Sequence, residues 1–170
     1  MFVYCLAFFL HRLVKYPKLL FQYTNIGEVL ANFESPMSTA VKGLTPEQAL
    51  EEIKKSGDDV IFLDVRTPEE FAEGHQEKAI NIPVNVFNDS GAMVPNPSFI
   101  EQVNEKIGDK KDSTVICTCF AGRRGNTAAE KLIADGFDSV ANVVGGMGSW
   151  AQCGLECQGE IKNPNEFGTH

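Results

Sequence analysis

Two short segments rich in apolar residues, Val60–Leu63 and Thr114–Cys117, constrain the fold of this chain more than any other feature. A strand that is exposed on one face alternates apolar and polar residues, whereas a strand buried on both faces of a parallel sheet is apolar almost throughout. Both segments are therefore predicted to be buried strands. Residues 79–82 and 140–144 predict two further short strands.

Helices are predicted between these strands. Thr45–Gln48 and Thr67–Glu70 are capping boxes with proline at the first helical position. The first predicts a helix that ends at Gly57, and the second a short helix through Phe71. Further helices are expected over residues 97–107, 126–135 and 147–151, with a loop over 85–97. Strands that alternate with helices predict an α/β fold: one open, mostly parallel sheet with helices on both faces.

Size and charge limit the possible partners. The chain has 170 residues, about one domain's worth. Its 15 basic and 23 acidic residues give a net charge of −8, which argues against nucleic acid or an acidic membrane surface. The sequence contains no run of about 18 apolar residues, so it predicts no stable membrane span. The five cysteines form no regular disulfide framework, which favours a reducing compartment.

The two ends differ from the rest of the sequence. Residues 1–27 contain Arg12, Lys15 and Lys18 but no acidic residue. Residues 1–36 are interpreted as an extension, as upstream sequence ahead of a start at Met37, or as a cleaved presequence. A presequence would place the protein in a mitochondrion or another organelle rather than the cytoplasm. A secretory signal fits less well. Residues 156–170 are predicted to be a polar tail.

The loop after the second buried strand, Cys119–Gly125, carries the predicted chemistry. Binding sites in parallel sheets form beyond the carboxyl ends of the strands. Here a cysteine leaves the strand and a helix follows, so loop N–H groups, the helix N-terminus and Arg123 and Arg124 would all stabilise a thiolate over a thiol. Gly122 and Gly125 allow a tight turn. The loop therefore predicts a nucleophilic Cys119 in a cationic site for a small oxyanion.

In order along the chain, a set of short motifs resembles the rhodanese-like sulfurtransferases over about residues 44–155. The motifs are Leu63-Asp64-Val65-Arg66, Glu70-Phe71, Gly74-His75, Ala79-Ile80-Asn81-Ile82-Pro83, the Cys-x-x-Gly-x-Arg loop at Cys119, Gly122 and Arg124, then Gly136-Phe137 and Gly145-Gly146-Met147 with Trp150. The resemblance implies a single domain with a five-stranded sheet. It also implies transfer of a sulfane sulfur from thiosulfate through a persulfide on Cys119, with no metal, nucleotide or other cofactor.

The same resemblance assigns roles to the loop residues. Arg124 would orient the loop and bind the sulfonate of the donor. Phe120, Ala121, Gly122, Arg123 and Gly125 would line the substrate site. Position along the chain suggests two further residues. Asp64 ends a buried strand and is expected to support the site, with a hydrogen bond to the loop as the less favoured role. Arg66 is expected to form a salt bridge or to lie at the entry, with binding of the donor less favoured.

The family usually has Ser or Thr where this chain has Gly125. Thiosulfate:glutathione sulfurtransferases share this glycine, so glutathione is the expected acceptor, with a thioredoxin-like protein or cyanide as others. The segment Gln76–Lys78 is more highly charged than the family pattern. The sequence gives no indication of oligomeric state.

Other interpretations remain open at this point. Cys117 and Arg123 have the Cys-x5-Arg spacing of cysteine phosphatases, but Cys117 would have to leave its strand. The domain could instead be a non-catalytic binding or redox-sensing module. A zinc site built from Cys117, Cys119, Cys153 and Cys157 is disfavoured, because Cys-x-Cys is a poor metal-binding pair. His75 is expected to stabilise a turn, and Cys153 and Cys157 to be surface thiols.

Overall fold

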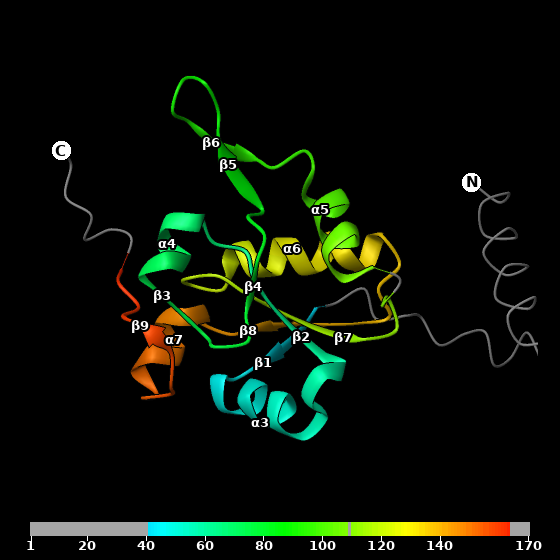
Figure 1. The fold of residues 1–170 in the computed structure, drawn as a ribbon, viewed down its shortest axis with the longest axis vertical. Coiled ribbons are helices and arrows are strands. Elements are labelled where there is room, and N and C mark those ends of the chain that lie inside the picture. Colours follow the sequence, from blue (N-terminus) through cyan, green and yellow to red (C-terminus); the bar gives the residue numbers. More distant parts are fainter. Residues whose placement is uncertain (1–40, 109, 164–170) are drawn as a thin grey trace, which may run out of the picture. The chain divides into compact units, whose positions relative to one another are not determined.

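Five parallel strands form the central sheet of this computed structural model, which describes residues 41–108 and 110–163 (Figure 1). The strand order is β1-β8-β7-β2-β4. All four neighbouring pairs are parallel. The strands are β1 (Lys42–Leu44), β2 (Val60–Asp64), β4 (Ile80–Asn81), β7 (Thr114–Thr118) and β8 (Ser139–Val143). The predicted α/β fold with a five-stranded parallel sheet is confirmed, although β1 was not among the predicted strands.

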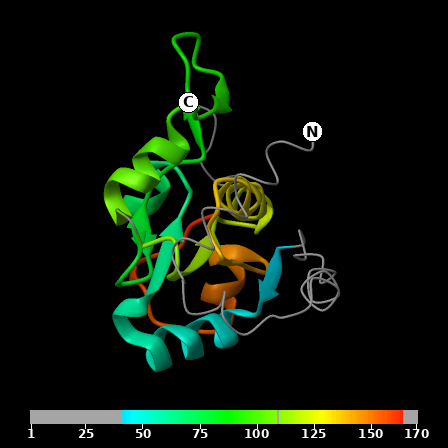
Figure 2. The ribbon, with the colours of Figure 1, turned by 90° about the vertical axis from the view of Figure 1, so that its right-hand side faces the viewer.

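Helices cover both faces of the sheet, and two apolar clusters hold them there. Residues of α3 (Pro46–Ser56) and α7 (Gly146–Gln152) pack with Phe62 and Ile116. Residues of α5 (Phe99–Ile107) and α6 (Arg123–Ala134) form a second cluster that includes the strand neighbours Ile61, Leu63, Val115 and Cys117. In Figures 1 and 2 the helices α3 and α6 lie on opposite sides of the sheet. Consecutive strand residues thus point into different clusters, which explains why the strands are apolar throughout.

Both predicted capping boxes are present. The Thr45 hydroxyl accepts from the Gln48 N–H at the start of α3, and the Gln48 side chain accepts in return. Thr67 and Glu70 make the same reciprocal pair at the start of α4 (Pro68–Glu73). A short 3-10 turn, η2 (Gly57–Asp59), follows α3.

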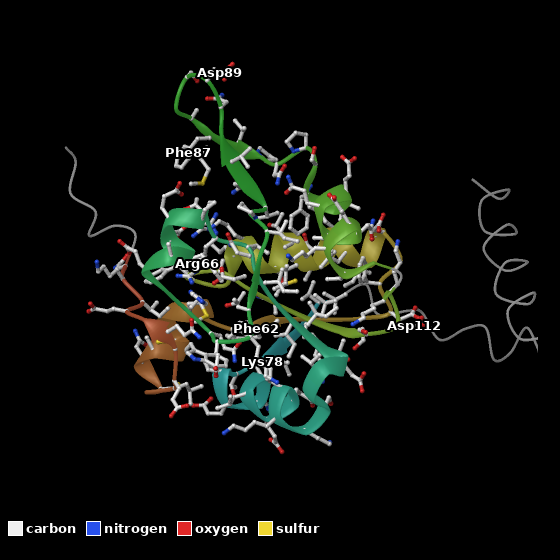
Figure 3. The ribbon with its side chains drawn as sticks, viewed as in Figure 1. Phe62, Arg66, Lys78, Phe87, Asp89 and Asp112 are labelled. Atoms are coloured by element: carbon white, nitrogen blue, oxygen red, sulfur yellow. The ribbon has the colours of Figure 1, made fainter. Side chains whose placement is uncertain are left out.

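A hairpin replaces part of the loop predicted over residues 85–97. Strands β5 (Asn85–Phe87) and β6 (Met93–Pro95) pair antiparallel and project from the body of the domain (Figure 3). Phe87 is 58% exposed and its cross-strand partner Met93 is 46% exposed. The prediction failed because each strand has only three residues, too few for an alternating apolar pattern to be recognised in sequence.

Residues 156–163 of the predicted polar tail make contacts with the rest of the domain. Strand β9 (Gln158–Gly159) pairs antiparallel with β3 (Gly74–His75), and Ile161 packs against the apolar cluster beneath α3. Gly159 has φ +76°, and a side chain there would overlap the Glu73 carbonyl oxygen. Backbone proximity rather than an apolar pattern therefore determines this pairing.

The predictions for residues 1–36 and 164–170 lie outside the described residues. In the part of the chain that the structure describes, no helix is both long and apolar enough to cross a membrane.

Candidate active site

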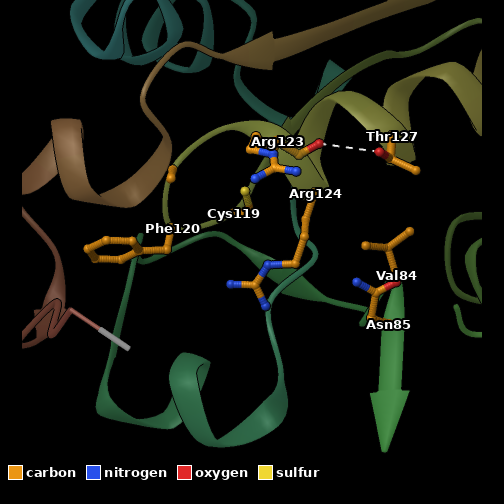
Figure 4. Close-up of a pocket in the computed structure, with 8 residues that line it drawn as sticks. Val84, Asn85, Cys119, Phe120, Arg123, Arg124 and Thr127 are labelled. Carbon is orange, nitrogen blue, oxygen red and sulfur yellow. Dashed lines mark hydrogen bonds between the residues drawn. The ribbon is translucent and has the colours of Figure 1, made fainter. Parts of the chain in front are cut away.

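The loop between β7 and α6 borders a pocket of about 400 Å³ at the carboxyl end of the sheet (Figure 4). Its lining residues are Val84, Asn85, Cys119, Phe120, Ala121, Arg123, Arg124 and Thr127. Five of these residues belong to the loop predicted to carry the chemistry. Val84, Asn85 and Thr127 were not predicted. Val84 and Asn85 lie beyond the carboxyl end of β4, where a site was expected in a parallel sheet.

The sulfur of Cys119 lies at the base of this loop. The residue is 1% exposed, and its Sγ accepts a hydrogen bond of 3.1 Å from the Gly122 N–H. Gly122 has φ +88°, a conformation that favours glycine and turns its N–H toward the sulfur. The loop therefore directs a backbone donor at the Cys119 sulfur.

The N-terminus of α7 fixes the backbone of the same loop. The Met147 N–H donates to the Cys119 carbonyl at 2.7 Å, and the Gly148 N–H donates to the Phe120 carbonyl at 2.9 Å. Gly146 has φ +60°, and a side chain there would overlap both carbonyl oxygens. Gly146, the first residue of α7, is thus required for this close approach of two backbones.

Arg124 lies in the pocket but is already paired. It donates to Glu70 through Nη1 at 2.7 Å and Nη2 at 2.6 Å. The hydrogen bonds to Glu70 raise the pKa of Arg124 by more than burial lowers it, and the nearby Cys119 raises it further. Glu70 thus holds Arg124 in the pocket that Cys119 also lines. Glu70 was predicted only to cap a helix and to belong to a family motif; its pairing with Arg124 was not predicted.

Arg123 is the loop cation with an exposed side chain. It lines the pocket, and within the described ranges it forms no ion pair. Helix α6 begins at Arg123 rather than at Asn126 as predicted, so both arginines belong to its first turn. The partial positive charge of the helix N-terminus and the Arg123 guanidinium therefore act on the same small volume.

Asp64 and Arg66 form a buried pair beside the site. They are 0% and 1% exposed, and Arg66 Nη2 lies 2.6 Å from Asp64 Oδ2. The same nitrogen donates to the Gly74 carbonyl at 2.6 Å, so the pair joins the end of β2 to β3. Neither residue lines the pocket, and Asp64 contacts neither loop arginine. The Arg66 guanidinium bridges Asp64 and the Gly74 carbonyl, a geometry that suits the supporting role predicted for both residues.

Cys117 remains inside β7 and is 0% exposed. Burial raises the pKa of its thiol far above the ordinary value, and the nearby Cys119 raises it further. Cys117 does not line the pocket. The phosphatase spacing from Cys117 to Arg123 therefore places its cysteine in the core and not at the pocket.

The remaining candidates lie away from the pocket. His75 Nδ1 is 2.8 Å from the Phe71 carbonyl, and its ring stacks on Phe71 with 3.8 Å between centroids, consistent with a turn-stabilising role. Cys153 is exposed and Cys157 half-buried, both as free thiols. Among the residues that the structure describes, no group of three or more His, Cys, Asp or Glu side chains could hold a metal ion.

Comparison with known proteins identifies the domain. The profile of the rhodanese-like domain matches residues 45–153. The chain belongs to this family. The Arabidopsis thaliana protein named HIGH ARSENIC CONTENT 1, mitochondrial, is 45% identical over 94 residues, which cover 55% of this chain and 54% of that protein. Thiosulfate sulfurtransferase 16, chloroplastic, from the same plant is 44% identical over 94 residues, covering 55% of this chain and 76% of that protein.

A solved structure agrees with this assignment of a rhodanese-like domain. The rhodanese-related protein from Thermoplasma volcanium is 27% identical, with a TM-score of 0.53, and the match covers 70% of this chain and 99% of that one. The match to the first of the two plant relatives spans about half that protein's length. Several relatives are named sulfurtransferases, which supports sulfurtransferase activity in general.

Proposed function

We propose that this rhodanese-like domain transfers the sulfane sulfur of thiosulfate to a thiol through a persulfide on Cys119. The observation that carries the proposal is the position of the Cys119 sulfur. It accepts the Gly122 N–H at 3.1 Å and borders a pocket that two arginines line. A nucleophile beside cations suits a substrate that is an anion and carries an electrophilic sulfur.

In the first step the Cys119 thiolate attacks the outer sulfur of thiosulfate. A new sulfur–sulfur bond forms as the bond to the sulfonate sulfur breaks, and sulfite leaves with the electron pair. Arg123 is the group available to bind the sulfonate oxygens, because Arg124 is held by Glu70. The Gly122 N–H stabilises charge on the Cys119 sulfur.

In the second step an acceptor thiolate attacks the outer sulfur of the persulfide. This restores the Cys119 thiolate and releases the acceptor persulfide. Glutathione is the proposed acceptor, and the exposed Arg123 suits its carboxylates. A thioredoxin-like protein could also deliver a thiol to the pocket. Cyanide would accept the same sulfur as thiocyanate.

The test is sulfite release from thiosulfate with glutathione or cyanide as acceptor. Wild type and Cys117→Ala should turn over, and Cys119→Ala should not. A folded wild type that releases no sulfite would refute the proposal and favour a binding or redox-sensing module. Loss of turnover in Cys117→Ala but not in Cys119→Ala would refute the assignment of the nucleophile.

A further inference from the structure

Asn142 in β8 is a buried residue that touches the catalytic loop without lining its pocket. It is 8% exposed, and its Nδ2 donates to the Gly122 carbonyl at 3.0 Å. The Asn126 N–H donates to the same oxygen at 2.9 Å. Asn142 Oδ1, in contrast, is buried with no hydrogen-bond partner among the described residues. Since a buried unpaired acceptor is costly, packing alone is a poor reason for an asparagine at this position.

The position of this unpaired oxygen is explained by Gly125. A Cβ placed on Gly125 would overlap Asn142 Oδ1 and would lie 3.3 Å from Thr118 backbone atoms. The asparagine amide therefore occupies the space that a side chain at position 125 would fill. This chain therefore cannot accommodate a side chain at position 125 unless Asn142 moves.

We propose that Asn142 is a positioning residue for Cys119 that compensates, from the neighbouring strand, for the missing side chain at Gly125. Gly122 presents its N–H to the Cys119 sulfur and its carbonyl to Asn142. Glycine has the least restricted backbone of any residue, so its conformation depends on the hydrogen bonds at both ends. By holding the carbonyl, Asn142 keeps the N–H directed at the sulfur. This inference rests on the proposed role of Cys119.

The first variant is Asn142→Asp, which keeps the shape of the side chain but replaces the N–H donor with an ionisable oxygen. We expect kcat for sulfite release to fall at least about tenfold, because the hydrogen bond to Gly122 is lost and two oxygens then face each other. KM for thiosulfate should change by less than about twofold, because Arg123 is untouched. The matched control is Asn104→Ala. Asn104 also has a buried, unpaired Oδ1, and it bonds Asp135 instead of the loop.

The second test exchanges the two positions. Gly125→Ser alone should lower kcat, because the new side chain displaces Asn142. Gly125→Ser combined with Asn142→Ala should recover most of the lost activity, because the alanine leaves room for the serine. A double variant no better than Gly125→Ser, or a Gly125→Ser variant as active as wild type, would overturn the proposed exchange. Unchanged kcat in Asn142→Asp would overturn the positioning role.

A readout that needs no turnover separates this proposal from the proposed function. Amide hydrogen exchange followed by NMR should be about tenfold faster at Gly122 in Asn142→Asp, while the Ala128 amide in the middle of α6 keeps its wild-type rate. If wild type transfers no sulfur, the function proposed for Cys119 fails, and the exchange rate at Gly122 still tests the anchor. An unchanged Gly122 rate would overturn it.

Discussion

Arg124 donates two hydrogen bonds to Glu70, at 2.7 and 2.6 Å, across 54 positions of sequence. Glu70 also accepts the Thr67 N–H at 3.0 Å, so one carboxylate caps α4 and holds the first turn of α6. The two side chains are 20% and 12% exposed. This pair fixes Arg124 beside Cys119 and leaves Arg123 as the exposed cation of the loop.

The first prediction concerns Glu70→Gln. Burial raises the pKa of Glu70, but the hydrogen bonds from Arg124 and Thr67 and the charges of Arg124 and Arg66 lower it by more. A carboxyl whose pKa is lowered on folding stabilises the fold above its unfolded value of about 4.3. We expect Glu70→Gln to cost about 1–3 kcal/mol at neutral pH, measured by urea unfolding.

The sign of the pH dependence provides the control for this prediction. The cost of Glu70→Gln should shrink as pH falls below about 4, because wild-type Glu70 then becomes protonated as well. Glu73→Gln in the same helix should cost little at any pH. Its ion pair with Lys162 is 3.6 Å long, and the two side chains are 26% and 49% exposed, so the pair contributes little. A Glu70→Gln cost that stays constant down to acidic pH would contradict the account.

The second prediction separates the two arginines. Arg123→Ala should raise KM for thiosulfate about tenfold, because the exposed cation binds the donor, and should leave stability within about 0.5 kcal/mol. Arg124→Ala should lower both stability and kcat, because it leaves Glu70 buried without its partner. Lys131→Ala, about two turns further along α6, is the control for net charge. If Arg124→Ala changed only the KM for thiosulfate, Arg124 and not Arg123 would be the residue that binds the donor.

The third prediction concerns cysteine reactivity in the native protein. Iodoacetamide should label the exposed Cys153 and also Cys119, which is buried but borders the pocket. Cys117 should remain unlabelled until the protein unfolds, because burial both shields it and raises the pKa of its thiol. Peptide mass mapping after timed labelling measures this. Native labelling of Cys117 at the rate of Cys153 would mean that β7 does not hold it in the core.

The fourth prediction compares two glycines with similar backbone angles. Gly146 has φ +60° and no room for a side chain, whereas Gly154 has φ +66° and no neighbouring atom within 4 Å. Gly154→Ala should cost about 1–2 kcal/mol, the strain of the left-handed conformation alone. Gly146→Ala should cost clearly more and abolish activity, because it separates α7 from the loop. Equal costs in thermal unfolding would show that the overlap is relieved elsewhere.

Features encoded within a few residues could be predicted from the sequence. The capping boxes at Thr45 and Thr67 predicted the starts of two helices, and the apolar runs predicted β2 and β7. Cys119 was placed correctly at the end of a buried strand because the strand pattern stops before it. Each of these features depends on the capping chemistry of a few adjacent residues or on a short pattern of apolar residues, and both can be read directly from the sequence.

Features that join distant segments could not be predicted. Nothing near Glu70 indicates Arg124 as its partner, and nothing near Gly125 indicates Asn142. Strand β9 has two residues and is held to β3 by backbone contacts at Gly159, which leave no apolar pattern. Each of these contacts forms only once the fold has brought together segments that are far apart in the sequence.

The most direct test of the central claim is the intact mass of the protein after incubation with thiosulfate and removal of the excess. The account predicts that wild type gains the mass of one sulfur atom on Cys119, with one sulfite released per chain, and loses that mass on addition of glutathione or cyanide. Cys119→Ala should gain nothing. A wild type that gains no mass, or a Cys119→Ala variant that gains the same mass, would contradict it.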